Sequence, residues 1–256
     1  MAAGRCSPSL RRSGKAPDRP ARVVFLDDGG VLNDNERRAV EWRRYVPEFF
    51  IPRLGGTADA WSEANRVVAL ESWHRYLAHM AVATQGVEPY LREADRRWLR
   101  DMCSLVGVPG PLPDEIDDLV TAAQRYACER CRSAYPDVIG AVFLLAREGL
   151  ALHTASGETS AQLAAYLRGM GVRDCFDRLY GTDLVDRFKC GPAYYAAIVA
   201  DSGVDPHEAV VVDDSPEALG WAEACGLRPI HLDRAGRGST FERITTLAEL
   251  PLLLGV

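Results

Sequence analysis

The chain has 256 residues, of which 47% are apolar and 26% are charged, and its formal net charge is −6. A chain of this length can bury a sizeable core, either as one domain with a large insertion or as two small domains. The negative charge argues against nucleic acid or an anionic membrane surface as the main partner, and no apolar run is long enough to span a bilayer. Seven scattered cysteines, an odd number, do not form a disulfide framework and favour a reducing, cytoplasmic location.

The N-terminal segment, residues 1–20, is rich in Arg, Ser, Pro and Gly and lacks the apolar region of a signal peptide. A segment of this composition cannot bury enough apolar surface to offset the entropy lost on folding. It therefore predicts a disordered leader, and a transit peptide is the alternative.

An apolar run and an acidic turn follow the leader. Residues 23–26, Val-Val-Phe-Leu, are short and unrelieved enough to form a strand buried on both faces of a parallel sheet. Asp27 and Asp28 come where this strand ends, and two glycines then predict a tight turn. Because ligands of open α/β sheets bind beyond the carboxyl ends of strands, the acidic pair is a candidate site. A solvated turn is the alternative interpretation.

The same stretch resembles the first motif of the haloacid dehalogenase (HAD) superfamily, in which Asp, two further residues, Gly, Thr or Val and Leu follow an apolar strand. With Asp27 in the lead, Gly30 takes the place of the motif's glycine, whereas Asp28 in the lead would put a valine there. The resemblance implies that Asp27 is the nucleophile. It also puts Gly29 where most HAD phosphatases carry a second Asp, the general acid/base. Asn33, just after the motif, is a candidate substrate-binding residue.

Residues 36–135 show apolar side chains at helical spacing and predict an all-helical insertion placed directly after the first strand and its turn. The resemblance makes this insertion a C1-type cap, which closes over the catalytic end of the sheet. We expect its tryptophans, Trp42, Trp61, Trp73 and Trp98, to pack the cap's own core, with one or two lining the substrate pocket.

Other residues of the insertion also suggest function. Cys128 and Cys131 form a CxxC, but the surrounding sequence is helical and no second CxxC or paired His follows, so packing is favoured over a zinc or redox site. His74, His79 and the Arg-rich helices of the insertion are candidate substrate contacts, although a single histidine on a helix is more often structural.

Beyond residue 135 the chain alternates strand and helix, which is typical of βαβ units. One predicted strand ends in Thr154, Ala155 and Ser156, and a helix begins at about residue 159. A hydroxyl at a strand end, close to a helix N-terminus, can donate to a phosphate oxygen. The stretch resembles the second HAD motif, with Thr154 in the Ser/Thr position, and the resemblance implies that all three residues contact the substrate.

Only two of the 30 basic residues are lysines, Lys15 in the leader and Lys189. Since arginine supplies the basic charge everywhere else, this single lysine of the folded part suggests a need for a compact ammonium, for example between a carboxylate and a phosphate. Lys189 comes shortly before a proline that opens a predicted helix, an arrangement that resembles the third HAD motif. The resemblance implies a catalytic and substrate-binding role; an ordinary surface lysine is the alternative.

Residues 209–212, Ala-Val-Val-Val, form the clearest predicted strand and end in Asp213 and Asp214. Two acidic strand ends side by side make a hard, oxygen-rich site suited to Mg²⁺. The stretch resembles the fourth HAD motif. The resemblance implies that Asp214 binds the metal directly, that Asp213 binds it directly or through water, and that Asp27 and the carbonyl of Gly29 complete the protein ligands.

Four motifs thus occur in the order of the HAD superfamily. The predicted fold is an α/β Rossmann-like core with a parallel sheet, made from residues 21–35 and 136–256, and the cap is the all-helical insertion at 36–135. The resemblance implies a Mg²⁺-dependent hydrolase, most simply a phosphatase acting on a small phosphorylated metabolite, in which Asp27 attacks phosphorus while Thr154 and Lys189 bind phosphoryl oxygens.

Gly29 limits how far this mechanism carries over, because leaving-group protonation lacks its usual agent unless Asp28, Asp34 or a cap residue replaces it. Leaving groups that need little protonation, such as aryl, acyl or anomeric phosphates, are therefore favoured. Phosphonatase-like relatives need a cap lysine, which this cap lacks. Metal-free haloacid dehalogenases have a fourth motif unlike Asp213 and Asp214. The alternative is a HAD-fold protein with dehalogenase-like or diphosphate-directed chemistry, or with a ligand- or partner-binding role.

Overall fold

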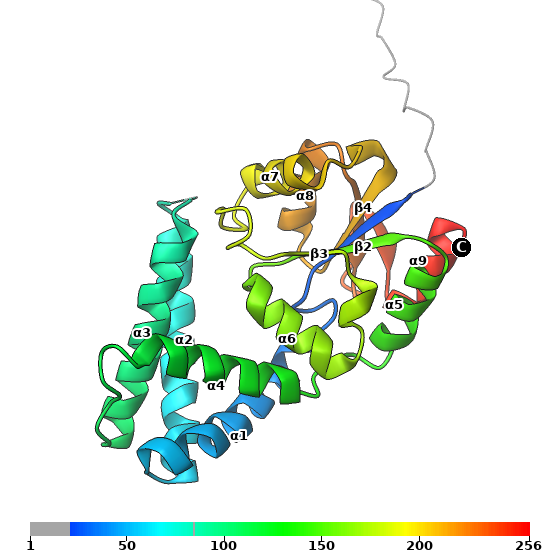
Figure 1. Ribbon diagram of the computed structural model, residues 1–256. Helices are drawn as coiled ribbons and strands as arrows, with labels where there is room; N and C mark the ends of the chain where they lie inside the picture. Colours follow the sequence, from blue (N-terminus) through cyan, green and yellow to red (C-terminus); the bar gives the residue numbers. More distant parts are fainter. Residues whose placement is uncertain (1–20, 84) are drawn as a thin grey trace, which may run out of the picture.

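The computed structural model describes residues 21–83 and 85–256, so the predicted leader lies outside the described residues. Within these ranges the chain forms a sheet-containing core and a group of long helices beside it, as Figure 1 shows. The predicted fold class, a parallel α/β core with an all-helical insertion, is confirmed.

The centre of the core is a parallel sheet with six strands in the described part of the chain, in the order β3-β2-β1-β4-β5-β6. The strands are β1 (Val23–Leu26), β2 (Ala151–Ala155), β3 (Arg178–Tyr180), β4 (Ala209–Asp213), β5 (Arg228–Leu232) and β6 (Glu242–Ile244). The strand order reverses at β1, which lies between β2 and β4. Ligands of such sheets bind beyond the carboxyl ends of the strands at this kind of reversal.

Helices cover both faces of the sheet (Figure 1). Because successive side chains of a strand point to opposite faces, Val24 and Leu26 pack on one side of β1, and Val23 and Phe25 on the other. The first side holds α5 (Val138–Arg147), α6 (Ser160–Met170) and α9 (Leu250–Leu254), and the second holds α7 (Pro192–Ser202) and α8 (Pro216–Ala224). All four residues of β1 are therefore buried, as its uninterrupted apolar sequence predicts.

The insertion lies between β1 and β2, and we refer to its helices as the cap. They are α1 (Asn35–Leu54), α2 (Ala58–Met80), α3 (Val87–Val106) and α4 (Ile116–Arg130). The cap has its own hydrophobic core, in which the ring of Trp61 stacks on Phe50 with the ring centroids 4.8 Å apart, and Trp98 packs beside them. Trp61 and Trp98 are thus the core residues that the sequence predicted.

The cap joins the core where α4 packs against α6. The indole N–H of Trp42 donates to the hydroxyl of Tyr166, 2.7 Å away, across this seam. Cys128 and Cys131 are buried in the same seam. Burial raises the pKa of both thiols, that of Cys131 to about 12, so both stay protonated and unreactive at neutral pH. The CxxC therefore serves packing.

The C-terminal part of the core differs from the sequence prediction, which ended the sheet with residues 228–232. The structure adds β6, which pairs with β5 through residues 230–232. β6 is only three residues long and two of them are exposed, so it carries almost no periodic signal. None of the helices in the described ranges is both long and apolar enough to cross a membrane.

We predict that Gly169→Ala destabilises the protein because a Cβ at this position of α6 would lie 2.5 Å from the carbonyl oxygen of Glu129 in the cap. Overpacking of this kind lowers the free energy of unfolding by about 1–3 kcal/mol. Gly140→Ala in α5 is the matched control, because a Cβ there meets nothing within 4 Å. Its better helix propensity should raise the stability by up to about 1 kcal/mol. Urea unfolding of both variants tests this, and equal effects would contradict the close contact between α4 and α6.

Candidate active site

The carboxyl ends of β1 and β4 meet at the point where the strand order reverses. Leu26 pairs with Val212, and the amide of Asp27 donates to the carbonyl of Val212 at 3.0 Å. This register puts the first residue beyond β1, Asp27, beside the last residue of β4, Asp213. Two carboxylates that are 186 positions apart in the sequence numbering become neighbours because their strands are adjacent in the sheet.

Lys189 lies in the loop before α7 and extends its side chain between these strand ends. Its Nζ donates to Oδ1 of Asp27 at 2.8 Å, to Oδ2 of Asp213 at 2.7 Å and to the carbonyl of Ala155 at 2.7 Å. All three hydrogens of the ammonium therefore have acceptors, one from each of three neighbouring strands. The side chain of Lys189 is only 10% exposed.

Burial and mutual repulsion shift the proton affinities of these groups. Burial raises the pKa of Asp27 to about 6, and the charge of Asp213 raises it too, while Lys189 opposes both effects. Burial alone would lower the pKa of Lys189, but the charges of Asp213 and Asp27 outweigh it and raise the pKa well above its usual range. The pKa of Asp214 is raised by burial and by Asp27. Lys189 is therefore charged, and its ammonium is the positive charge that interacts with all three carboxyl groups, those of Asp27, Asp213 and Asp214.

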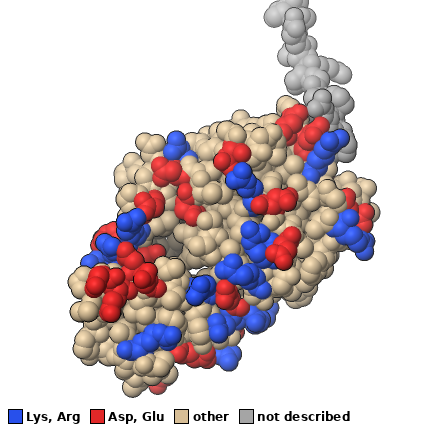
Figure 2. Space-filling view, in the orientation of Figure 1, with Lys and Arg blue, Asp and Glu red and all other residues tan. Residues whose placement is uncertain are grey.

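A cavity of about 910 Å³ opens above these groups, between the core and the cap. Figure 2 shows the surface hollowed between the two parts, and acidic and basic side chains are intermixed on this face of the molecule. Of the predicted site residues, six line the cavity: Asp27, Gly29, Ser156, Lys189, Asp213 and Asp214. The structure thus brings together residues from all four predicted motifs.

Thr154, Ala155 and Asn33 do not line the cavity, and their contacts with the substrate stay predictions. Thr154 is the fourth of five residues in β2, so its side chain still points into the packed face of the sheet, and its hydroxyl is fully buried. Ala155 contributes only its carbonyl, to Lys189. Asn33 is 1% exposed and is engaged within the core, since its amide donates to Asp28 and its carbonyl oxygen accepts from Ser133.

Ser156 is the first residue beyond β2, and it lines the cavity. Its Oγ accepts a hydrogen bond from the amide of Glu158 at 3.2 Å. Because the oxygen acts as acceptor in this bond, the hydroxyl hydrogen is available to a ligand oxygen. The capped N-terminus of α6 follows three residues later, at Thr159, and adds a favourable dipole for an anion.

Arg38 is a cavity residue that the sequence reasoning did not identify. A Cβ on Gly29 would lie 2.8 Å from Oδ1 of Asn35 and 3.3 Å from Nη2 of Arg38, so these side chains fill the space beside the glycine. Arg38 also donates to Asp28 and lies 3.3 Å from Glu158. Where a second aspartate would stand, the structure therefore presents a guanidinium. The one indication of this position in the sequence is that Arg38 follows Asp34, the N-cap of α1, by one helical turn.

Asp28 and Asp34, which we considered as replacements for the missing acid, have other partners. Asp28 is fully buried and accepts hydrogen bonds from Asn33 and Arg38. Asp34 accepts from the amides of residues 36 and 37 as the N-cap of α1. Neither lines the cavity, so neither is placed to protonate a leaving group.

The cap contributes aromatic side chains rather than histidines to the cavity. Trp73 and Tyr76 of α2 line it, whereas His74 and His79 do not. His79 instead stacks on Tyr90, with the ring centroids 4.1 Å apart. Tyr76 and Tyr90 are residues that the sequence reasoning missed, because a tyrosine on an amphipathic helix carries no signal that separates a pocket wall from a packed core.

The comparisons with known proteins agree with this geometry. Residues 21–226 match the family model of haloacid dehalogenase-like hydrolases. The chain belongs to this family. The resemblance that the four motifs suggested is thereby confirmed.

The relatives of this HAD-family hydrolase differ in activity. It is 29% identical over 122 residues to phosphoglycolate phosphatase of Rhodospirillum rubrum. The aligned region covers 44% of this chain and 51% of the relative. It is 25% identical over 128 residues to (S)-2-haloacid dehalogenase 1 of a Pseudomonas species, covering 48% and 56%. The chain thus spans about half the length of these curated relatives.

The shared fold is seen in solved structures. The L-2-haloacid dehalogenase of Xanthobacter autotrophicus superposes with a TM-score of 0.60 at 20% sequence identity, over 92% of this chain and 98% of that one. At this level of identity the similarity shows a common fold and carries no information about the substrate.

The HAD site has the donor set of a divalent cation site. One oxygen from each of Asp27, Asp213 and Asp214 lies within 4.8 Å of the others. These three carboxylates can carry more negative charge than the single ammonium of Lys189 balances. Gly30, with φ of 82°, allows this arrangement, because a Cβ there would clash with the carboxylate of Asp214. Carboxylate oxygens with excess negative charge suit Mg²⁺. The residues present therefore fit the metal that the motifs predicted, with the carbonyl of Gly29 as a further predicted ligand.

We predict that Lys189→Met lowers the free energy of unfolding by about 3–5 kcal/mol, because it leaves Asp27 and Asp213 buried without a compensating charge. Adding Asp213→Asn removes one of the two carboxylates, so the double variant should be more stable than Lys189→Met alone. Urea unfolding at pH 7 in metal-free buffer measures both differences. A double variant that is less stable than the single one would contradict the coupling between the ammonium and the carboxylates.

Proposed function

We propose that this HAD-family hydrolase is a Mg²⁺-dependent phosphatase that acts on a small phosphorylated metabolite, with Asp27 as the nucleophile. The observation that carries the proposal is the group formed by Asp27, Asp213, Asp214 and Lys189 at the bottom of a cavity large enough for a metabolite. A dianionic phosphoryl group would be strongly repelled by these carboxylates alone. The cluster is therefore suited to a phosphate that arrives together with a cation.

In the proposed reaction, a carboxylate oxygen of Asp27 forms a bond to phosphorus while the bond between phosphorus and the leaving-group oxygen breaks. Water then hydrolyses the aspartyl-phosphate and releases inorganic phosphate. Lys189 holds Asp27 in position at 2.8 Å and supplies positive charge to the reacting group. The Ser156 hydroxyl would donate to a phosphoryl oxygen, in keeping with the substrate contact that the sequence predicts for it together with Thr154 and Ala155.

Asp27, Asp213, Asp214 and the carbonyl of Gly29 would hold Mg²⁺, which would neutralise charge on the phosphoryl oxygens when bound. The chain's own contribution is to keep these carboxylates close together against their mutual repulsion. Lys189 does so for Asp27 and Asp213, and the absence of a side chain at Gly30 makes room for Asp214.

Departure of the leaving group is the step at which this chain differs from most HAD phosphatases. Gly29 offers no proton, and Arg38 beside it cannot supply one. Burial would lower the pKa of Arg38, but the carboxylates of Glu158 and Asp28 outweigh it and raise the pKa further. A permanent guanidinium at this place stabilises a leaving group that departs as an anion. We therefore infer a preference for aryl, acyl and anomeric phosphates.

Hydrolytic dehalogenation is the second candidate, and the pair Gly29 and Arg38 favours it, because a halide leaves as an anion and needs no acid. The carboxylates weigh against it. A 2-haloacid would bring its own carboxylate to a site where Asp213 and Asp214 already exceed the charge of Lys189. Halide release that is unaffected by chelator would decide for dehalogenation.

We predict Mg²⁺-dependent phosphate release from a panel of aryl, acyl, sugar and alkyl phosphates, measured colorimetrically. Asp27→Asn should lower the rate by at least about 10³-fold, because the amide is not a nucleophile. Addition of EDTA should abolish turnover. Asp118→Asn, an exposed carboxylate of α4, is the matched control and should keep the wild-type rate. Full activity of Asp27→Asn would rule out the assigned nucleophile.

We also predict a steep dependence of kcat/KM on the pKa of the leaving group. Phenyl phosphates with electron-withdrawing substituents should react faster than unsubstituted ones, and alkyl phosphates should be the slowest, by about 10²-fold or more, because no acid compensates for the poorer leaving group. The measurement is a series of substituted phenyl phosphates with ethyl phosphate as the reference. Equal kcat/KM for aryl and alkyl phosphates would show that another group acts as the acid.

A further inference from the structure

We propose that the substrate carries a flat aromatic group, which binds in the cavity between Trp73 of the cap and Trp221 of the core. The inference deepens the proposed function and rests on it in one respect, namely that the reacting end of the substrate lies at Asp27. The observations that carry it are the amount, the aromatic character and the position of apolar surface in this cavity.

Helix α2 consists of two halves with different surroundings. Its buried residues, Trp61, Ala64, Asn65 and Val68, all lie in the first half and pack the cap's core. Four large apolar or aromatic side chains of the second half line the cavity instead, at positions 73, 76, 77 and 80. This spacing presents a single helix face. Trp73 and Leu77 on that face are 55% and 42% exposed, so the protein keeps a large apolar surface uncovered directly beside its reactive carboxylates.

The core contributes a second apolar wall to the same cavity, formed by Ala218 and Trp221 of α8. Helix α8 begins just after Asp214, which would hold the predicted metal. The apolar wall of the core and Asp214 are thus parts of one short segment, residues 214–221. A ligand that reaches Asp27 and fills the cavity must contact this segment as well as α2.

The cap wall is aromatic and continues to the catalytic lysine. The ring of Trp73 stacks on Tyr76, with centroids 5.8 Å apart and planes inclined by 25°. Tyr76 meets the edge of Phe188 at 5.7 Å, and Phe188 is the neighbour of Lys189 in the chain. Aromatic rings gain energy from such stacked and edge-on pairs beyond the burial of their surface. Trp73 and Tyr76, which line the cavity, can therefore bind a further ring in the same way.

Tyr76 also has a polar atom for such a ligand. Its hydroxyl oxygen is buried and has no hydrogen-bond partner among the described residues. It lies 3.9 Å from the position of a Cβ on Gly157, next to the predicted phosphate-binding hydroxyl of Ser156. A buried hydroxyl without a partner costs free energy, which an oxygen of the ligand would recover. Tyr76 thus stands where an aromatic group would be joined to a phosphoryl group.

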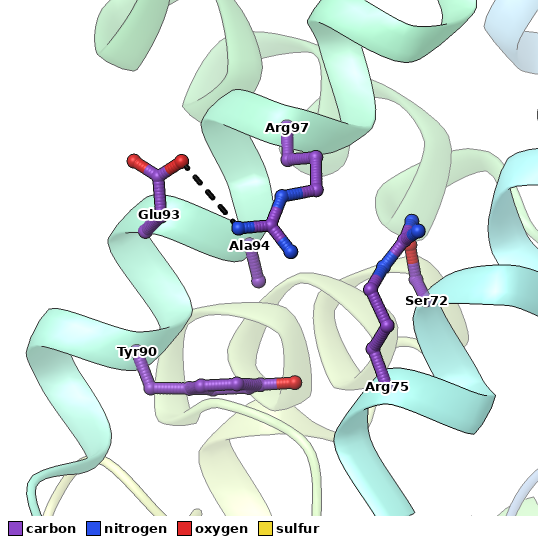
Figure 3. Close-up of a pocket in the computed structure, with 6 residues that line it drawn as sticks. All are labelled: Ser72, Arg75, Tyr90, Glu93, Ala94 and Arg97. Carbon is purple, nitrogen blue, oxygen red and sulfur yellow. Dashed lines mark ion pairs between the residues drawn. The ribbon is translucent and has the colours of Figure 1, made fainter. Parts of the chain in front are cut away.

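The volume of the cavity agrees with this substrate. About 910 Å³ is typical of sites for ligands much larger than a simple phosphate ester of a few carbon atoms. A second hollow of only about 70 Å³ lies between α2 and α3, where Figure 3 shows Tyr90, Arg75 and Arg97 around it. It is too small for a ring with a substituent, and its arginines are paired with carboxylates of the cap.

The test compares matched pairs of ligands by isothermal titration calorimetry on the Mg²⁺-loaded protein: phenylphosphonate with methylphosphonate, and phenylacetate with acetate. The phenyl member of each pair should bind at least about tenfold more tightly. Trp73→Ala should remove most of this difference and leave the methyl ligands unchanged, whereas Trp73→Phe should keep it. Phe143→Ala is the control, because Phe143 is a 50% exposed aromatic residue of α5 that does not line the cavity.

The outcomes separate this inference from the proposed function. Phosphonates that bind equally well with either substituent would overturn the aromatic site and leave the phosphatase proposal intact. Phenyl ligands that bind more tightly with either head group, without preference for the phosphonate, would support the aromatic site and count against the phosphatase. Failure of both phenyl ligands to bind, or equal effects of Trp73→Ala on the phenyl and methyl ligands, would overturn the aromatic site.

Discussion

The ammonium of Lys189 is the interaction on which the site depends. It joins the ends of three neighbouring strands, through Asp27 after β1, Asp213 at the end of β4 and the carbonyl of Ala155 in β2. Two carboxylates buried side by side would cost several kcal/mol without it. The strand order makes the arrangement possible, because only β1 has both β2 and β4 as neighbours. The site is thus a consequence of the sheet's reversal at its central strand.

A second group of charges connects the cap to this centre. Asp28, on the loop after β1, holds Arg38 in the first turns of α1, and Arg38 lies close to Glu158 before α6. Asp27 and Asp28 are adjacent in the chain but have opposite tasks. Asp27 lines the cavity, whereas Asp28 is fully buried and positions the guanidinium that stands beside Gly29. The departure from the usual motif and the start of the cap are therefore one structural feature.

The cap divides its apolar residues between its own core and the wall of the cavity. The first half of α2 packs against α1 and α3 through Trp61 and its neighbours, so the cap has a core of its own. The second half can then leave Trp73 and Leu77 uncovered without loss of the fold. A small helical insertion can present a binding surface to the core only if its packing is complete without that surface.

The sequence by itself determined the fold class and the positions of the charged groups that the structure places together. The buried strands are short apolar runs that cannot be amphipathic helices, and charges directly after such runs must lie at the carboxyl edge of the sheet. The spacing to Gly30 separated Asp27 from Asp28, and the scarcity of lysine singled out Lys189.

Only the tertiary structure decided which neighbouring side chains enter the cavity. Thr154 and Ser156 differ by two positions, and which of them lines the cavity depends on where β2 ends, which local sequence does not define to one residue. The direction of the Asn33 side chain was likewise not readable from the sequence: its amide donates to Asp28 inside the core. Arg38 and Trp73 look like ordinary surface residues of helices in the sequence. Their roles depend on which face of the cap meets the core, and that is set by contacts between residues more than a hundred positions apart, such as Trp42 with Tyr166.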